Sequence, residues 1–376
     1  MNPIHPPARA ASTRPDLFRR ALGAAVAALA LAFAAAPAAH AQTACDADID
    51  GDGVVGGEDL SGILASWGAC TGCSADINGD GLVDGNDLGA MLVLWGSTCQ
   101  PLSWTTVLEF APDPAVVTNG ALRKAIAATG LPWRVRDNGT QIEMLLVPPG
   151  TFNMGCSPSD QFSCNSNENP VHAVTLTNAF YIGRYEVTQA QWTARMGSNP
   201  SWFQGASAQV PAAQVPNRPI EEVSWNMIQG FLSATGLRLP TEAEWEYAYR
   251  AGTTTAFHSM PGFPNGTNDD NQAGNIAWFG SNSASQTRPV GGKAANALGL
   301  HDMSGNVWEW VNDWWSSNYY ASSPSTNPPG PATGTDRVLR GGSWYLDTHN
   351  LRSSNRINNP LGSIGTSIGF RVARAP

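Results

Sequence analysis

The sequence predicts an α+β protein in which a small α-helical module precedes one large domain of mixed structure. Near the N-terminus an internal repeat places a loop and an amphipathic helix in each of two copies. Further on, two helix starts stand out, because Thr188 with Gln191 and Thr241 with Glu244 form capping-box patterns. The remainder is rich in Trp, Gly, Pro and Asn, which favours brief strands and long ordered loops on a rigid scaffold.

Residues 1–41 have the pattern of a secretory signal peptide. A cationic pair, Arg19 and Arg20, precedes an Ala-rich apolar run that ends in Ala-His-Ala at 39–41, a small-x-small cleavage site. The run is nearly long enough to span a bilayer, so an uncleaved membrane anchor is the alternative. We expect a protein that is secreted, periplasmic or on the cell surface, with no membrane span after signal cleavage.

The net charge indicates which binding partners to expect, and the number of cysteines indicates the redox state of the compartment. The 376-residue chain has a net charge of −9, and the signal segment holds four arginines and one aspartate, so its removal leaves −12. An acidic chain of this kind disfavours nucleic acid or an anionic membrane surface as the partner. All six cysteines lie beyond residue 41, and an even count in an oxidising compartment favours disulfides over free thiols.

The N-terminal repeat, within residues 42–99, contains two calcium-loop patterns. "ADIDGDGVVGGEDL" from residue 47 returns as "ADINGDGLVDGNDL" from residue 75. Oxygen donors at fixed positions around a sharp Gly turn suit a hard cation that takes six to eight oxygens. Residues 45–99 also hold ten carboxylates and no Lys or Arg, a crowding that bound Ca²⁺ would neutralise. The expected ligands are Asp48, Asp50, Asp52, Val54 and Asp59 in the first loop, and Asp76, Asn78, Asp80, Leu82, Asp84 and Asp87 in the second.

One amphipathic helix follows each loop. The apolar face has the same spacing in both copies: Leu60, Ile63, Leu64 and Trp67, then Leu88, Met91, Leu92 and Trp95. Neither half could bury its face alone, so the two helices should pack on each other. Four cysteines flank the halves and are expected to link them, with a connectivity that the sequence leaves open: Cys45, Cys70, Cys73 and Cys99.

Two loop-plus-helix halves without an entering helix resemble a dockerin. The resemblance implies a protein partner, because the residues at loop positions 10 and 11 contact a cohesin in that family. Here those positions are Gly57-Glu58 and Gly85-Asn86 rather than small hydroxyl residues, which leaves a cohesin partner open. Residues 100–139, which include one short helical pattern, are expected to link this module to a large domain over residues 140–376.

Seven stretches of the large domain form an ordered set. They read "MLLVPPGTFNMG" (144–155), "FYIGRYEVTQAQW" (180–192), "PIEEVSWN" (219–226), "RLPTEAEWEYAYRAG" (238–252), "NALGLHDMSGNVWEWVNDWW" (296–315), "RVLRGGSW" (337–344) and "GFRVAR" (369–374). Together they resemble the formylglycine-generating enzyme (sulfatase-modifying factor) family. The resemblance implies a fold related to C-type lectins, with little regular secondary structure and structural calcium. It also implies oxidation of a sulfatase cysteine by a copper ion held between two thiolates.

The resemblance further implies a calcium site in "DMSGNVWE". Its ligands would be one side-chain oxygen, two backbone carbonyls and a carboxylate, a mixture that suits calcium, from Asp302, Gly305, Val307 and Glu309. Alternatively, Glu309 pairs with a nearby Arg. A second family site would start at Asn275 and Ile276, although the segment after them lacks an obvious Asp.

The copper-binding cysteines of that family have no counterpart here. They would follow Ser343 by three and eight residues, where this chain has Leu346 and Leu351. Cu(I) takes thiolate or thioether ligands, which Leu cannot supply, so we expect Ca²⁺ but not copper. Upstream, Cys156 and Cys164 favour a local disulfide over a metal site.

The residues around Ser343 are expected to shape a pocket, together with Trp308, Arg340 and Trp344. His349 at its edge is either a replacement ligand or base, or a solvated loop histidine. We therefore predict a secreted calcium-binding protein whose large domain is a non-catalytic binding or accessory module for a peptide or glycan. The alternatives are a metal-dependent oxidoreductase of the formylglycine-generating type and a surface-assembly component that docks through the dockerin-like module.

Overall fold

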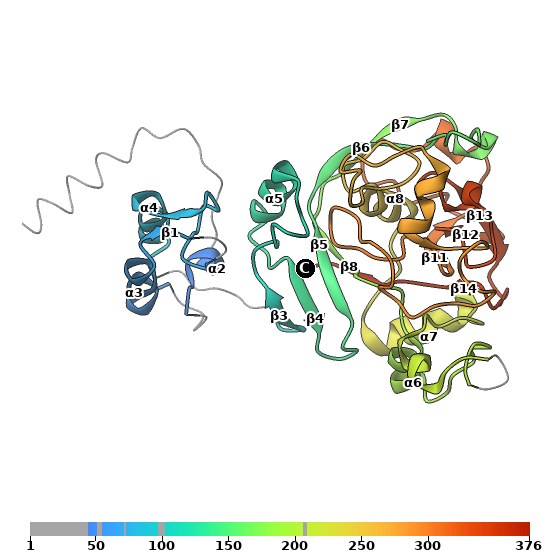
Figure 1. Cartoon of the computed structure of the whole chain (residues 1–376), viewed down its shortest axis with the longest axis horizontal. Helices are drawn as coiled ribbons and strands as arrows, with labels where there is room; N and C mark the ends of the chain where they lie inside the picture. The colour runs from blue at the N-terminus through green and yellow to red at the C-terminus, as the bar shows by residue number, and fades with distance from the viewer. Residues whose placement is uncertain (1–43, 51–54, 71–72, 97–101, 206–208) are drawn as a thin grey trace, which may run out of the picture.

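A computed structural model describes residues 44–50, 55–70, 73–96, 102–205 and 209–376 (Figure 1). The signal-peptide pattern, Asp52, Val54 and Cys99 lie outside these residues. The α-helices are α2 (Ala44–Ala47), α3 (Gly57–Ala65), α4 (Gly85–Val93), α5 (Gly120–Ala127), α6 (Gln189–Met196), α7 (Trp225–Thr235) and α8 (Glu242–Arg250). In the part of the chain that the structure describes, no helix is both long and apolar enough to cross a bilayer.

The strands are short and the connections between them long. They are β1 (Gly68–Ala69), β2 (Leu82–Val83), β3 (Thr105–Glu109), β4 (Arg134–Asp137), β5 (Glu143–Val147), β6 (Gly150–Met154), β7 (His172–Leu176), β8 (Phe180–Gly183), β9 (Ala277–Trp278), β10 (Ser304–Gly305), β11 (Trp308–Trp314), β12 (Asp336–Arg340), β13 (Arg356–Pro360), β14 (Ile368–Gly369) and β15 (Ala373–Arg374). Short 3₁₀ helices add η2 (Ser166–Glu168), η4 (Ala212–Asn217), η5 (Asp270–Asn275), η6 (Tyr319–Ala321) and η7 (Thr348–Leu351). This mixture confirms the α+β class.

The N-terminal module, blue in Figure 1, has the expected helix after each loop. Ile63 on α3 and Met91 on α4 are fully buried in one small core. The predicted apolar faces are wider than this core, however, because four of their members stay about half exposed: Leu64, Trp67, Leu92 and Trp95. Between the halves, β1 pairs with β2 and a disulfide joins Cys70 to Cys73.

An antiparallel five-stranded sheet runs in the order β15-β8-β5-β4-β3 (Figure 1). Pairing of β3 with β4 and of β4 with β5 places residues 105–109 and 134–137 in this sheet, although both segments were expected to form part of a linker. The pairing is stabilised where Arg134 contacts both Glu109 and Glu143, and where Trp133 and Val135 enter the core. The large domain therefore includes both segments.

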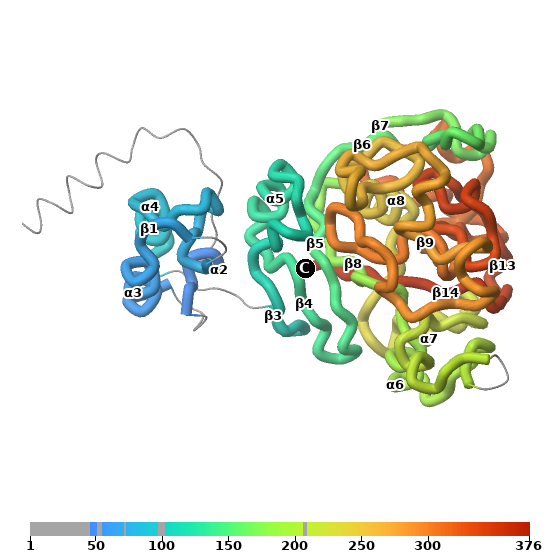
Figure 2. Tube along the Cα trace, viewed as in Figure 1, coloured from blue at the N-terminus to red at the C-terminus, as the bar shows by residue number. Residues whose placement is uncertain are grey.

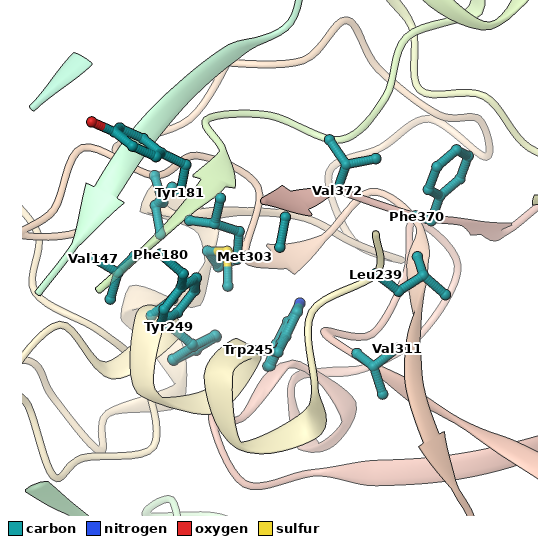
Figure 3. Packing of buried hydrophobic residues seen from close by; sticks show 14 of the residues in the cluster. Val147, Phe180, Tyr181, Leu239, Trp245, Tyr249, Met303, Val311, Phe370 and Val372 are labelled. Carbon is teal, nitrogen blue, oxygen red and sulfur yellow. The ribbon is translucent and has the colours of Figure 1, made fainter. Parts of the chain in front are cut away.

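A second sheet has the order β13-β12-β11-β14, and its strands all come from residues 308–369. The chain then returns to the first sheet, where β15 pairs with β8 beside the C-terminus (Figure 2). Helix α8 packs in the core, where its Trp245 and Tyr249 belong to the same cluster as Phe180 and Met303 (Figure 3). The two predicted capping boxes, at Thr188 for α6 and Thr241 for α8, are confirmed.

The acidic residues of α8 do more than cap it and complement its dipole. Glu244 closes the capping box and accepts from Arg238, as a residue in the first turn would. Glu242 and Glu246 are instead buried, and they pair with arginines from distant segments, namely Arg356 and Arg340. These ion pairs connect α8 to β12 and to β13, the two strands on either side of residues 341–355 in the chain.

Candidate functional site

Both positions of the family's thiolates are apolar in this fold. Leu351, at the end of η7, has no exposed surface and packs with Phe257, Met260 and Ile276. Its carbonyl oxygen accepts hydrogen bonds from the hydroxyls of Tyr249 at 3.0 Å and Ser304 at 3.1 Å. Leu346 is partly buried against the main core. None of the described cysteines is a free thiol, so this part of the chain offers no thiolate pair.

Three of the expected pocket residues are buried. Arg340 is fully buried, and its guanidinium donates to Glu246 and to the carbonyl oxygens of residues 353–355. Trp308, at the start of β11, is 3% exposed. Ser343 is also fully buried, and its hydroxyl has no hydrogen-bond partner among the described residues. Their side chains therefore face the interior rather than an open pocket.

Trp344 and His349 lie nearer the surface. The indole of Trp344 donates to the carbonyl of Thr366 at 2.9 Å, and its ring meets Phe203 edge to face. The imidazole of His349 lies 3.2 Å from the Asn165 amide and 3.4 Å from the Arg352 guanidinium. Burial, and then the charge of Arg352, lower the pKa of His349.

The predicted local disulfide between Cys156 and Cys164 is present. The Nη1 atom of Arg352 lies 3.6 Å from Sγ of Cys164. Because Arg352 directly follows Leu351, the disulfide is adjacent to the segment that lacks the family's thiolates. As a disulfide, it offers no thiolate to a metal.

The implied calcium site in residues 302–309 contains a crowded set of buried acids. Oδ2 of Asp302 accepts from the Gly291 amide at 2.6 Å, whereas Oδ1 is buried without a hydrogen-bond partner. Burial raises the pKa of Asp302 to about 6. Glu186, which sequence reasoning missed, accepts from the Asn306 side chain and the Val307 amide, at 2.6 and 3.0 Å. Burial, followed by the charges of Asp302 and Glu309, raises the pKa of Glu186.

Arg371 is the cation that faces these acids. It makes a bidentate pair with Glu309, whose carboxylate also accepts from the Trp245 indole at 2.7 Å. The alternative expectation, that Glu309 pairs with an Arg, therefore describes its contacts correctly. Three buried carboxyl groups lie near this guanidinium, Lys293 also acts on Asp302, and the orphaned Asp302 oxygen is a donor of the type that a hard cation takes.

The second implied calcium site has fewer available oxygen ligands. Asn275 closes η5, and its carbonyl already accepts from the Ala294 amide at 3.0 Å. Ile276 is fully buried in the same apolar cluster as Leu351. The carbonyl of Asn275 therefore has a protein partner, and Ile276 contributes to packing.

The N-terminal loops bring their acids together. In the first loop, carboxylate oxygens of Asp48, Asp50 and Asp59 lie within 4.8 Å of one another. In the second, Asp76 accepts from the amides of Asp80 and Gly81, and Asp87 accepts from those of Asn78 and Asp84. Gly79 and Gly81 take the left-handed conformation that the sharp turn requires. Oxygen donors of this kind are those that Ca²⁺ takes in proteins.

A cavity of about 680 Å³ lies where sequence reasoning placed no site. Three segments far apart in the chain line it: Pro200, Ser201, Trp202 and Gln204; Glu222 and Met227; and Ile364. Its neighbour Phe203 contacts Trp344, so the cavity adjoins the accessible end of the expected pocket. No spacing rule unites these residues, and only the fold brings them together.

Comparison with known proteins identifies the large domain. Residues 134–376 match the sulfatase-modifying factor enzyme 1-like domain. The formylglycine-generating enzyme of Streptomyces coelicolor is 32% identical over 70% of this chain and 95% of its own length. Serine/threonine-protein kinase pkn1 of Chlamydia caviae is 32% identical over 62% of this chain, which spans only 38% of that kinase.

A solved structure, Treponema denticola variable protein 1, superposes with a TM-score of 0.53 and is 31% identical. The similarity covers 62% of this chain and 95% of that one. The family match begins at Arg134, the first residue of β4, and runs to the C-terminus. The chain belongs to the sulfatase-modifying factor enzyme 1-like domain family.

Proposed function

We propose that this chain is an exported calcium-binding protein whose large domain binds a ligand without the thiolate–copper oxidation of formylglycine-generating enzymes. One observation carries the proposal: the thiolate positions are Leu346 and Leu351, and Leu351 is a fully buried member of an apolar cluster. Neither side chain can hold Cu(I) or transfer an electron. The signal pattern at residues 1–41 supports the exported location.

Calcium would have a structural role in both parts of the chain. The Asp-rich loops of the N-terminal module would each hold one ion through the ligands named above. In the large domain, Asp302 and Glu309, with the carbonyls of Gly305 and Val307, would hold another, and Glu186 adds charge beside it. Such ions would offset carboxylate repulsion and fix the surrounding loops.

The test compares this protein with an active enzyme on the same substrate. The purified, calcium-loaded chain is incubated with copper, oxygen and a Cys-x-Pro-x-Arg peptide, and the peptide mass is followed. The Streptomyces coelicolor enzyme serves as the positive control. We expect an unchanged peptide. Conversion of its cysteine to the aldehyde would establish the oxidoreductase alternative and overturn the proposal.

A second role, assembly on a protein partner, is favoured by the exposed apolar residues of the N-terminal module. Leu64 and Trp67 on one half and Leu92 and Trp95 on the other are 47–56% exposed. Repeated exposed apolar side chains of this size favour a protein contact. The full chain would be tested on immobilised cohesin domains with calcium or a chelator. Calcium-dependent binding that Trp67→Ala/Trp95→Ala abolishes supports this role, and its absence removes a cohesin as the partner.

A further inference from the structure

Three exposed apolar side chains line the 680 Å³ cavity. Trp202 is 59% exposed, Ile364 57% and Met227 39%. They come from the loop after α6, the loop before β14 and the first turn of α7. Single exposed apolar residues are ordinary, but three around one hollow of ligand-binding size indicate a recognition surface.

The walls of this cavity are held by hydrogen bonds. The carboxylate of buried Glu221 accepts from the Phe203 amide at 2.8 Å, and the Ser201 hydroxyl accepts from the Glu221 amide at 3.2 Å. The Glu222 amide donates to the carbonyl of Gly365 at 3.0 Å, which joins two of the lining segments. A ligand would therefore meet a largely preformed surface and pay little for ordering it.

Glu222 is the charged residue of the lining, and its backbone is strained. Its φ of 60° lies in the left-handed region, which costs a non-Gly residue free energy and recurs at functional sites. Its carboxylate makes no hydrogen bond or ion pair with any residue that the structure describes. Glu221 lies next to it, with Oε2 buried and unpartnered. The Glu222 carboxylate therefore places one negative group in the lining, which also includes the exposed indole of Trp202.

We propose that this cavity binds a polypeptide segment that presents an Arg or Lys side chain next to an apolar one. The cation would pair with Glu222 and lie against the face of Trp202, while the apolar neighbour contacts Met227 and Ile364. A neutral sugar would leave the carboxylate charge unmatched, which makes a cationic peptide the better occupant. This inference rests on the proposed function, since it names the ligand of a non-catalytic binding domain.

The experiment measures retention of peptide pools on the immobilised full chain with calcium. The octapeptides lack cysteine, are random at six positions, and have Leu-Arg, Leu-Lys, Leu-Gln or Leu-Glu fixed at the centre. We expect the Arg and Lys pools to be retained about tenfold more than the Gln pool, and the Glu pool least. Trp202→Ala should lose retention of all pools.

Glu222→Gln should abolish the preference for a cation while the melting temperature stays near that of the parent chain. The matched control is Glu58→Gln, which removes the same charge from an exposed site in the N-terminal module and should change nothing. Equal retention of the Arg and Gln pools, or a preference that survives in Glu222→Gln, overturns the proposal. So does binding of maltohexaose or cellohexaose that needs Trp202 but not Glu222.

The experiments distinguish failure of the proposed non-catalytic function from failure of the proposed peptide ligand. If the cysteine peptide stays unoxidised and the cationic pools are not retained, the non-catalytic function stands and this ligand assignment falls. If the cysteine peptide is oxidised, the non-catalytic function falls whatever the pools show.

Discussion

Glu309 and Arg371 form a buried bidentate ion pair in which both nitrogen–oxygen distances are 2.6 Å. Neither side chain is more than 1% exposed, and the pair joins β11 to the segment after β14. Arg371 also donates to the carbonyls of Gly183 and His301, so it connects both sheets to the implied calcium loop. The pair therefore has a structural role whether or not a cation is bound nearby.

The first prediction removes one member of this pair. Glu309→Gln leaves the Arg371 charge buried with a weaker partner, and we expect the free energy of unfolding to fall by about 3–5 kcal/mol. If calcium also uses this carboxylate, the increase in the free energy of unfolding that calcium gives the parent chain should shrink in the variant. Urea titrations with calcium and with a chelator measure both effects.

The control for that variant is Glu143→Gln. Glu143 contacts Arg134, Arg136 and Arg184 on a partly exposed face, where ion pairs contribute only about 0–1 kcal/mol. A loss in Glu309→Gln no larger than in this control would show that the buried pair does not stabilise the fold.

The second prediction concerns the position that replaces a family thiolate. Because Leu351 is fully buried, Leu351→Ala should leave a cavity and cost about 2–5 kcal/mol. Leu351→Cys should cost less, since its sulfur fills part of that volume. Val171→Ala, at a 47% exposed site, should stay within about 0.5 kcal/mol of the parent. Chemical denaturation at pH 7 gives all three values, and a neutral Leu351→Ala would contradict the packing described here.

The sequence was most informative where a motif is local. Capping boxes at Thr188 and Thr241 depend on residues three positions apart, so the pattern alone located both helix starts. The ordered stretches from residue 144 onward were sufficient to identify the family fold. The disulfide between Cys156 and Cys164 also closes a short loop, and it was anticipated for that reason.

The sequence was misleading where burial decides a side chain's role. Arg340 and Trp308 lie in motifs that suggest a pocket, yet tertiary packing turns both into the core. Residues 105–109 and 134–137 join the sheet through β3–β4 and β4–β5 pairing, which is a contact between separate segments that no local motif announces. The cavity around Trp202 joins three distant segments, so no local pattern could have revealed it.

The third prediction concerns how the free energy of unfolding depends on pH. Burial, then repulsion from Glu242, raises the pKa of Asp313 to about 8, while its carboxylate accepts from the Glu242 amide at 2.7 Å. The folded state therefore holds this proton above the pH at which an unfolded Asp releases it. Between about pH 4 and pH 8 this group makes stability fall as pH rises, by up to about 1.4 kcal/mol per pH unit.

Asp313→Asn removes that titration while keeping an oxygen for the Glu242 amide. Relative to the parent chain, the variant should become progressively more stable from pH 4 to pH 8. Unfolding free energies of both proteins at unit pH steps give the difference directly. A difference that does not change with pH would mean that Asp313 titrates normally in the folded state.

The last prediction concerns the N-terminal loops, whose final acids have matching contacts. Asp59 accepts from the amides of Ile49, Asp50 and Gly56, and Asp87 accepts from those of Asn78 and Asp84. Asp87→Asn removes one charge and one strong oxygen donor, so calcium affinity of the second loop should fall at least about tenfold while the first loop still binds. Calorimetric titration of the full chain should show one tight site fewer. Glu58→Gln, which alters no expected ligand, should leave the isotherm unchanged. If Glu58→Gln lowered the calcium affinity as much as Asp87→Asn, the loss would come from the net charge of the module and not from a lost ligand.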